Sequence, residues 1–195
     1  MNRIAEINRK TAETEIYLKL NLDGSGNYKI NTGIAFLDHM LSLFAKHGFF
    51  DLEINAAGDI EVDFHHTMED LGIVLGDAIN KALGDRTSIN RYGSFLLPMD
   101  ETLARTALDL SNRPYLVYNV EAPAAYVGTI DCRLFYEFFQ ALVNRSGMNL
   151  HIDLLRSGEA HHAFEAIFKS FAKSLDIATM KNDRIQGVLS TKGVL

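Results

Sequence analysis

The stretch FLDHMLSLF at residues 36–44 has a counterpart in LFYEFFQAL at residues 134–142. In both copies a short alternating segment follows, and then the pattern His-His-x-x-Glu, at residues 65–69 and 161–165. The offset between the copies is 98 residues at the first stretch and 96 residues at the histidine pairs. Similar patterns that recur in one order at nearly one spacing indicate a duplicated unit of roughly 90 residues.

Hydrophobic spacing predicts the secondary structure of each unit. Apolar and polar residues alternate over 16–22 and 50–56, which is typical of half-buried strands. Apolar residues at helical spacing over 71–82 and 164–178 predict amphipathic helices. Gly84 is expected to end the first of these helices. Because a helix with one apolar stripe must cover a sheet, each unit is expected to pair helices with strands.

We therefore predict an α+β fold: a two-layer, internally duplicated unit of a mostly antiparallel sheet with helices on one face. Residues 1–195 are expected to form a single domain made of two similar halves, about 1–89 and 90–182, lying side by side. The residues 183–195, which include two glycines, are expected to form an irregular C-terminal tail.

Composition narrows the class of protein. The chain has 19 Lys and Arg against 25 Asp and Glu, a net charge of −6, so we expect no nucleic-acid partner. Its single cysteine, Cys132, cannot form an internal disulfide, which fits a reducing compartment. No apolar run approaches the roughly 18–20 residues of a membrane span, and the first ten residues contain no apolar signal core. The sequence thus predicts a cytoplasmic protein that does not bind membranes.

The two His-His-x-x-Glu patterns predict metal binding. Residues four apart share one face of a helix, so His65 and Glu69 can bind one ion, and His161 and Glu165 another. One such pattern alone is more often a solvated helix face, but two copies inside a duplication favour a metal. Imidazole and carboxylate without thiolate suit Mn, Fe, Co, Ni or Zn, and the sequence does not choose among them.

The remaining histidines extend this pattern. Adjacent helical residues point about 100° apart, so His66 and His162 are expected to reach a different ion from their neighbours. His39 begins the first helix of the first copy, and Glu137 corresponds to it in the second; each can add a ligand. His47, two helical turns after His39, either lines the same cleft or interacts with the C-terminal end of its helix.

Six phrases, taken together and in this order, resemble the imidazoleglycerol-phosphate dehydratase family: GIAFLDHML (33–41), DFHHTMED (63–70), NRYG (90–93), LDLSNRPY (108–115), HHxxEA (161–166) and STKGVL (190–195). The match runs from about Glu6 to Leu195. The resemblance implies a hydro-lyase of histidine biosynthesis that converts imidazole glycerol phosphate to imidazole acetol phosphate. It also implies two Mn²⁺ ions per active site, with other divalent transition metals possible. Trimers assembled into a 24-subunit shell, with active sites between subunits, are implied as well.

Transferred by position, the resemblance assigns residues to four sets. One ion would be bound by His39, His66, His161 and Glu165. The other ion would be bound by His65, Glu69, Glu137 and His162. The catalytic residues would be Glu13 as the acid/base group, His47 and Glu165. The substrate would contact Glu13, His39, His47, His65, Glu69, Arg91, Arg113, His162, Lys169, Ser190 and Lys192, with Arg91, Arg113, Ser190 and Lys192 chiefly holding its phosphate.

Two positions depart from the family pattern. Glu137 stands where many relatives have His, which makes that metal site harder and more anionic. Phe64 stands where relatives often have Asp, which removes a possible acceptor for a ligand histidine. Two other interpretations remain open: a dimetal hydrolase, because paired His/Glu metal sites also activate water, and a metal-storing or scaffolding shell protein without activity.

Overall fold

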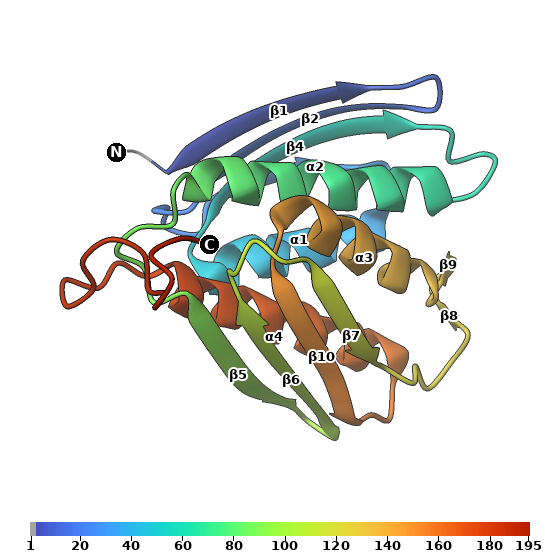
Figure 1. The fold of residues 1–195 in the computed structure, drawn as a ribbon. Helices are drawn as coiled ribbons and strands as arrows, with labels where there is room; N and C mark the ends of the chain where they lie inside the picture. The colour runs from blue at the N-terminus through green and yellow to red at the C-terminus, as the bar shows by residue number, and fades with distance from the viewer. Residues whose placement is uncertain (1–2) are drawn as a thin grey trace.

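The chain forms two four-stranded sheets with four helices between them, within the residues 3–195 that this computed structural model describes (Figure 1). The first half contains β1 (Ile4–Lys10), β2 (Thr14–Asn21), β3 (Tyr28–Asn31), α1 (Ala35–Gly48), β4 (Asp51–Gly58) and α2 (His65–Leu83). The second half contains β5 (Tyr92–Met99), β6 (Thr102–Asp109), β7 (Tyr115–Asn119), α3 (Leu134–Ser146), β10 (Asn149–Arg156) and α4 (Ala160–Thr179). A short hairpin of β8 (Tyr126–Val127) and β9 (Ile130–Asp131) precedes α3.

Both sheets have the same topology. The strand order is β1-β2-β4-β3 in the first and β5-β6-β10-β7 in the second. In each sheet two strand pairs are antiparallel and the last pair, β3 with β4 or β7 with β10, is parallel. The first helices of the two halves end at Phe49 and Gly147, 98 residues apart, both in the left-handed conformation. The predicted α+β class with mostly antiparallel sheets is confirmed.

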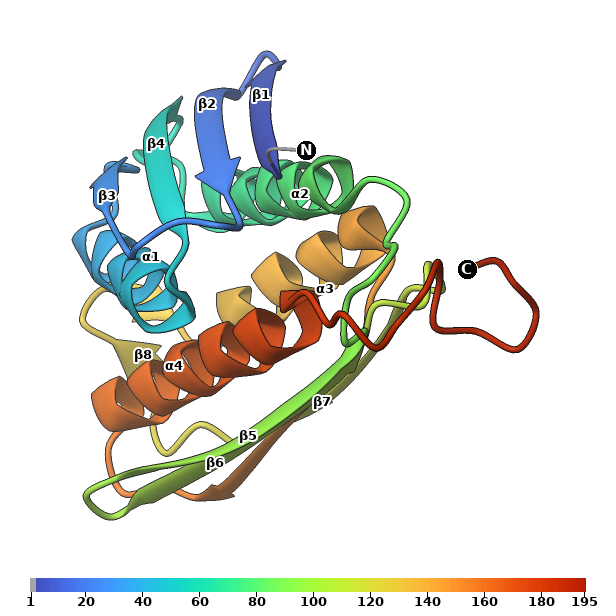
Figure 2. The same cartoon turned by 90° about the vertical axis from the view of Figure 1, so that its left-hand side faces the viewer.

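The two halves face each other through their helices. Helix α2 packs on α3 and α1 packs on α4, while the sheets lie on the two outer sides (Figure 2). This differs from the expected side-by-side arrangement, because each half has two layers but the whole chain has four. The reason is the width of the buried helix surfaces: 12 of the 19 residues of α2 and 14 of the 20 of α4 are buried. One stripe against a sheet accounts for about three residues in seven, so the other buried residues need a second contact.

Close packing of α2 on α3 depends on Gly72. A Cβ atom at this position would lie 2.3 Å from the backbone oxygen of Phe138. We expect Gly72→Ala to lower the free energy of unfolding by about 1–3 kcal/mol, because overpacking outweighs the roughly 1 kcal/mol that alanine contributes to a helix. Urea unfolding checks this, with the exposed Lys81→Ala of the same helix as the control. A Gly72→Ala protein of unchanged stability would contradict this packing.

All four helices run in the same direction. Their N-terminal ends lie at the right-hand end of the molecule in Figure 1, whereas the C-terminal tail lies at the opposite end. The histidine pairs begin α2 and α4, so both are carried to one end of the fold. Among the helices of residues 3–195, none combines the length and apolar character that a bilayer crossing requires.

Candidate functional site

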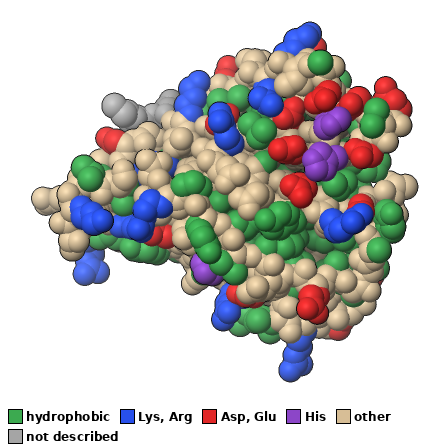
Figure 3. Space-filling model, turned by 45° about the vertical axis from the view of Figure 1, so that its right-hand side comes forward, with side chains coloured by type: hydrophobic (Ala, Val, Ile, Leu, Met, Phe, Trp, Pro, Cys, Tyr) green, Lys and Arg blue, Asp and Glu red, His purple; other side chains and the backbone are tan. Residues whose placement is uncertain are grey.

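The first cluster joins α1 to α4. His39 Nε2 lies 2.7 Å from Glu165 Oε1, and His161 Nε2 lies 3.1 Å from the same oxygen. The i, i+4 spacing places His161 and Glu165 on one helix face, as predicted, and packing of α1 on α4 brings His39 to them. These three ligand atoms lie within 4.8 Å of one another, a spacing that fits a metal ion. Figure 3 shows histidine side chains gathered with acidic side chains on the side of the molecule where the helices begin.

Glu165 is the electrostatic centre of this cluster. Burial favours its neutral form, but hydrogen bonds from Lys169 and His39 outweigh that effect and hold the pKa of Glu165 at about 2. Lys169 donates to Oε2, which leaves Oε1 to the two histidines. His47 lies near Lys169 and Lys173; burial lowers the pKa of His47, and the two lysine charges lower it further. The imidazole of His47 is therefore neutral at physiological pH.

The second cluster is formed by α2 and α3. His65 Nε2 lies 3.5 Å from Glu69 Oε2, and Glu137 lines the same cavity of about 560 Å³ as His65. His65 and Glu69 precede His161 and Glu165 by 96 residues, and Glu137 follows His39 by 98 residues. The two clusters thus occupy corresponding places in the two halves. The first offers two imidazoles and one carboxylate within 4.8 Å of one another, whereas the second offers one imidazole and two carboxylates that are not gathered that closely among residues 3–195.

The outer histidine of each pair points away from its neighbour's cluster. His66 Nδ1 lies 3.0 Å from Asp59 Oδ2, and His162 Nδ1 lies 3.1 Å from Glu101 Oε2. Asp100 lies close enough to Glu101 and His162 for the three to form a further potential ligand group. The hydrogen bond to Asp59 raises the pKa of His66, and the hydrogen bond to Glu101 raises that of His162. Within residues 3–195, His66 therefore does not join the group of His39, His161 and Glu165.

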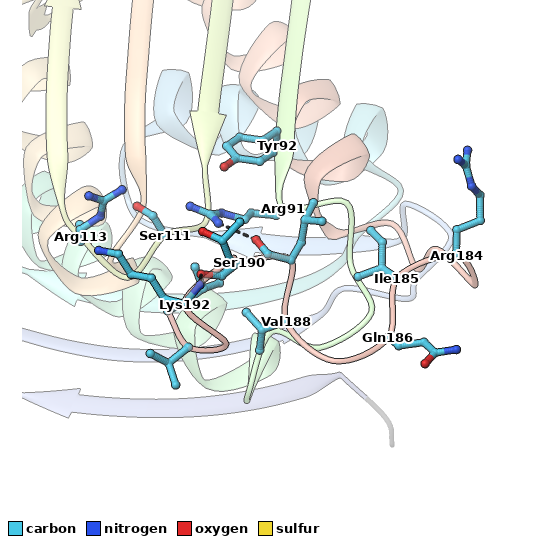
Figure 4. Close-up of a pocket in the computed structure, with 14 residues that line it drawn as sticks. Arg91, Tyr92, Ser111, Arg113, Arg184, Ile185, Gln186, Val188, Ser190 and Lys192 are labelled. Atoms are coloured by element: carbon cyan, nitrogen blue, oxygen red, sulfur yellow. Dashed lines mark hydrogen bonds between the residues drawn. The ribbon is translucent and has the colours of Figure 1, made fainter.

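The four residues expected to hold phosphate line one cavity of about 840 Å³ beside the C-terminal tail (Figure 4). They are Arg91, Arg113, Ser190 and Lys192. The Arg91 guanidinium uses most of its hydrogen-bond donors within the protein. It pairs with Asp109 at 2.6 Å and donates to the Leu189 carbonyl oxygen at 2.6 Å. It fixes the tail against β6, whereas Arg113 and Lys192 are exposed. The cavity thus combines an anchored arginine with two exposed cations.

This cavity and the two His/Glu clusters lie at opposite ends of the folded molecule. Helix α4 begins beside His161 and ends at Thr179, directly before the tail. At 1.5 Å per residue the helix separates His161 from Thr179 by about 27 Å. A small phosphorylated molecule cannot contact both ends at once.

The carboxylates that hold the site residues have roles that the sequence did not predict, although Glu101, like Glu13, was a candidate acid or base. Asp59 and Glu101 bind the outer histidines, and Asp109 binds Arg91. Asp109 lies inside the LDLSNRPY phrase, and Glu101 corresponds to Glu13 by position. The sequence therefore offered a reason to single out both residues. Asp59 lies seven residues before His66 in a loop without periodicity, and its role appears only in the structure.

Comparison with known proteins decides the family. The family model described as imidazoleglycerol-phosphate dehydratase matches residues 32–175. The chain belongs to the imidazoleglycerol-phosphate dehydratase family. The resemblance drawn from the six phrases is therefore confirmed, as is the prediction of a hydro-lyase.

Relatives and solved structures of the family cover almost the whole chain. The chain is similar to the imidazoleglycerol-phosphate dehydratases of Trichlorobacter lovleyi, at 58% identity over 195 residues, and Acetivibrio thermocellus, at 54%; both alignments span each protein completely. The Staphylococcus aureus enzyme structure is 41% identical with a TM-score of 0.84, over 92% of this chain and 99% of that one. The Pyrococcus furiosus structure is 34% identical with a TM-score of 0.84, over 97% and 100%.

Proposed function

We propose that this protein removes water from imidazole glycerol phosphate to give imidazole acetol phosphate, in histidine biosynthesis in the cytoplasm. We further propose that it uses two divalent transition-metal ions per active site, with Mn²⁺ as the expected metal. The observation that carries the metal proposal is the group of His39, His161 and Glu165, with the corresponding His65–Glu69 pair at the same end of the fold, in a family member.

The donor atoms of the two clusters fit such ions. Imidazole nitrogen and carboxylate oxygen, without thiolate, suit Mn²⁺ and its neighbours. Glu165 is ionised at neutral pH, as a metal ligand must be. His66 and His162 each have Nδ1 held by a carboxylate, an arrangement common among metal-binding histidines because it leaves Nε2 to the ion. Phe64 does not leave His66 without an acceptor, because Asp59 supplies one. When bound, the cations would act as Lewis acids that stabilise negative charge on the imidazole ring of the substrate.

The separation of the two ends of the chain supports an active site between subunits. Within one chain, α4 separates the histidine cluster from the cavity with Arg113 and Lys192 by about 27 Å. One chain would therefore supply the histidine cluster of an active site, and another chain the cavity. The clusters also have three candidate ligands each, and the outer histidines of a neighbouring copy would provide the fourth. Self-association is therefore part of the proposal, in the trimers and 24-subunit shell that the family resemblance implies.

Different residues of the protein would bind the substrate and transfer its proton during dehydration. Arg113 and Lys192 would bind the phosphate and hold the substrate through charge-assisted hydrogen bonds. Glu13 is exposed in the turn between β1 and β2 and would take the proton from the carbon next to the one that loses hydroxide. The resulting enol becomes the ketone. His47 and Lys169 would complete the polar lining between α1 and α4.

Product analysis with and without metal tests this function. We expect the purified full-length protein with Mn²⁺ to form the ketone from imidazole glycerol phosphate, to lose turnover after chelation and to recover it when Mn²⁺ is restored. Ketone formation that survives complete metal removal would contradict the metal proposal. Release of inorganic phosphate without ketone would instead indicate a hydrolase, and binding of many ions without turnover a storage protein.

A further inference from the structure

Two corresponding glutamates have different surroundings. Glu13 and Glu101 are 88 residues apart, and each lies in the turn between the first two strands of its half. The Glu101 carboxylate is bound to His162 Nδ1 through both oxygens, at 3.1 and 3.2 Å. The Glu13 carboxylate lies 3.7 Å from His66 Nε2, which is too long for a hydrogen bond. The glutamate at this position thus accepts a hydrogen bond from a histidine in the second half but not in the first.

Asp59 accounts for the difference in the first half. Its Oδ2 holds His66 Nδ1 at 3.0 Å, and its backbone N–H donates to the Glu13 carbonyl oxygen at 3.1 Å. One residue therefore connects the turn that carries Glu13 to the helix that carries His66. Its other carboxylate oxygen, Oδ1, is buried and has no hydrogen-bond partner among residues 3–195.

The position of the second half that corresponds to Asp59 carries no carboxylate. Ser157 follows Asp59 by 98 residues, the same offset that relates the stretches at 36–44 and 134–142. In the part of the chain that the structure describes, the Ser157 hydroxyl is buried and makes no hydrogen bond. Glu101 packs closely here, since a Cβ atom at Gly158 would lie 2.6 Å from Glu101 Cγ. Glu101 thus takes the place at the histidine that Asp59 occupies in the first half.

The geometry points to Asp59 as a positioning residue that holds the His66 ring with Nε2 available to a cation and so leaves the Glu13 carboxylate uncommitted. The inference rests on the proposed function, in which His66 is a metal ligand and Glu13 transfers a proton. It explains why Glu13, and not its counterpart Glu101, is free for that transfer. A carboxylate on the far nitrogen of a ligand histidine typically changes metal affinity by about 10–100-fold.

Two variants of Asp59 and one control test the inference. Asp59→Asn keeps the shape of the side chain but removes its charge, and Asp59→Glu restores a carboxylate on a longer side chain. Glu61→Gln makes the same change of charge at an exposed position of the same loop. Calorimetric titration of the metal-stripped full-length protein with Mn²⁺ gives affinity and stoichiometry, and thermal unfolding of the metal-free protein reports on the fold.

We expect Asp59→Asn to weaken Mn²⁺ binding by about 10–100-fold while the metal-free unfolding temperature stays unchanged. Asp59→Glu should recover part of that loss, and Glu61→Gln should bind as the wild type does. Wild-type Mn²⁺ affinity in Asp59→Asn would overturn the inference. So would equal loss of affinity and of metal-free stability in both Asp59 variants, which indicates a structural role only.

The proposed function is tested separately by product formation in the wild-type protein. If the wild type binds Mn²⁺ but forms no ketone, the proposed function fails while the binding data still decide the role of Asp59. If the wild type forms ketone and Asp59→Asn binds Mn²⁺ normally, the function stands and the positioning role is wrong.

Discussion

Glu13→Gln is expected to lower kcat by about 10²–10⁴-fold, the usual contribution of a general acid/base group, while metal content stays at the wild-type level. Glutamine has the shape of glutamate but cannot accept the proton. The Glu13 side chain is about half exposed, at 52%, and lies in a turn, so its replacement should not disturb the fold. Steady-state kinetics with saturating Mn²⁺ and substrate, together with metal analysis, measure both quantities.

A matched control exists in the same hairpin. Glu15 is exposed on the neighbouring strand and forms a 2.7 Å ion pair with Lys10. Glu15→Gln makes the same chemical change close by, and we expect it to leave kcat unchanged, since surface pairs of this kind contribute little. If Glu13→Gln retains wild-type turnover, proton transfer must be assigned to another group. A loss of bound metal in Glu13→Gln would instead place Glu13 among the ligands.

The second large effect is recovery of activity when two inactive chains are combined. Glu13→Gln and Arg113→Ala alter opposite ends of the molecule, and each alone is expected to be nearly inactive. If each active site draws Glu13 from one subunit and Arg113 from another, about a quarter of the sites in an equal, random mixture contain both wild-type groups. Co-expressed chains should therefore regain about that fraction of wild-type activity.

Differently tagged chains make this measurement possible, because only mixed assemblies survive two successive affinity steps. The control is Glu13→Gln co-expressed with a second tagged copy of itself, which should remain inactive. Mixed assemblies without recovered activity would show that both groups of a site come from one chain. Chains that never co-purify would contradict self-association itself.

The sequence by itself determined the features that depend on local geometry. The spacing of His65 and Glu69 placed both on one helix face and His66 on another, because a residue's direction follows from the 3.6-residue turn alone. Alternation and helical spacing likewise determined the α+β class, and the recurrence at 96–98 residues determined the repeated topology.

Local patterns did not decide how distant groups meet. The family resemblance assigned His39 and Glu165 to one ion, but their contact across 126 residues forms because α1 packs on α4, and periodicity shows only that a helix face is buried, not what buries it. The four-layer arrangement, the Asp59 contact with His66 and the separation of the cation cavity from the histidine clusters have the same origin. Each depends on how two elements with correct local patterns pack together, and that packing is set by the complementarity of whole surfaces.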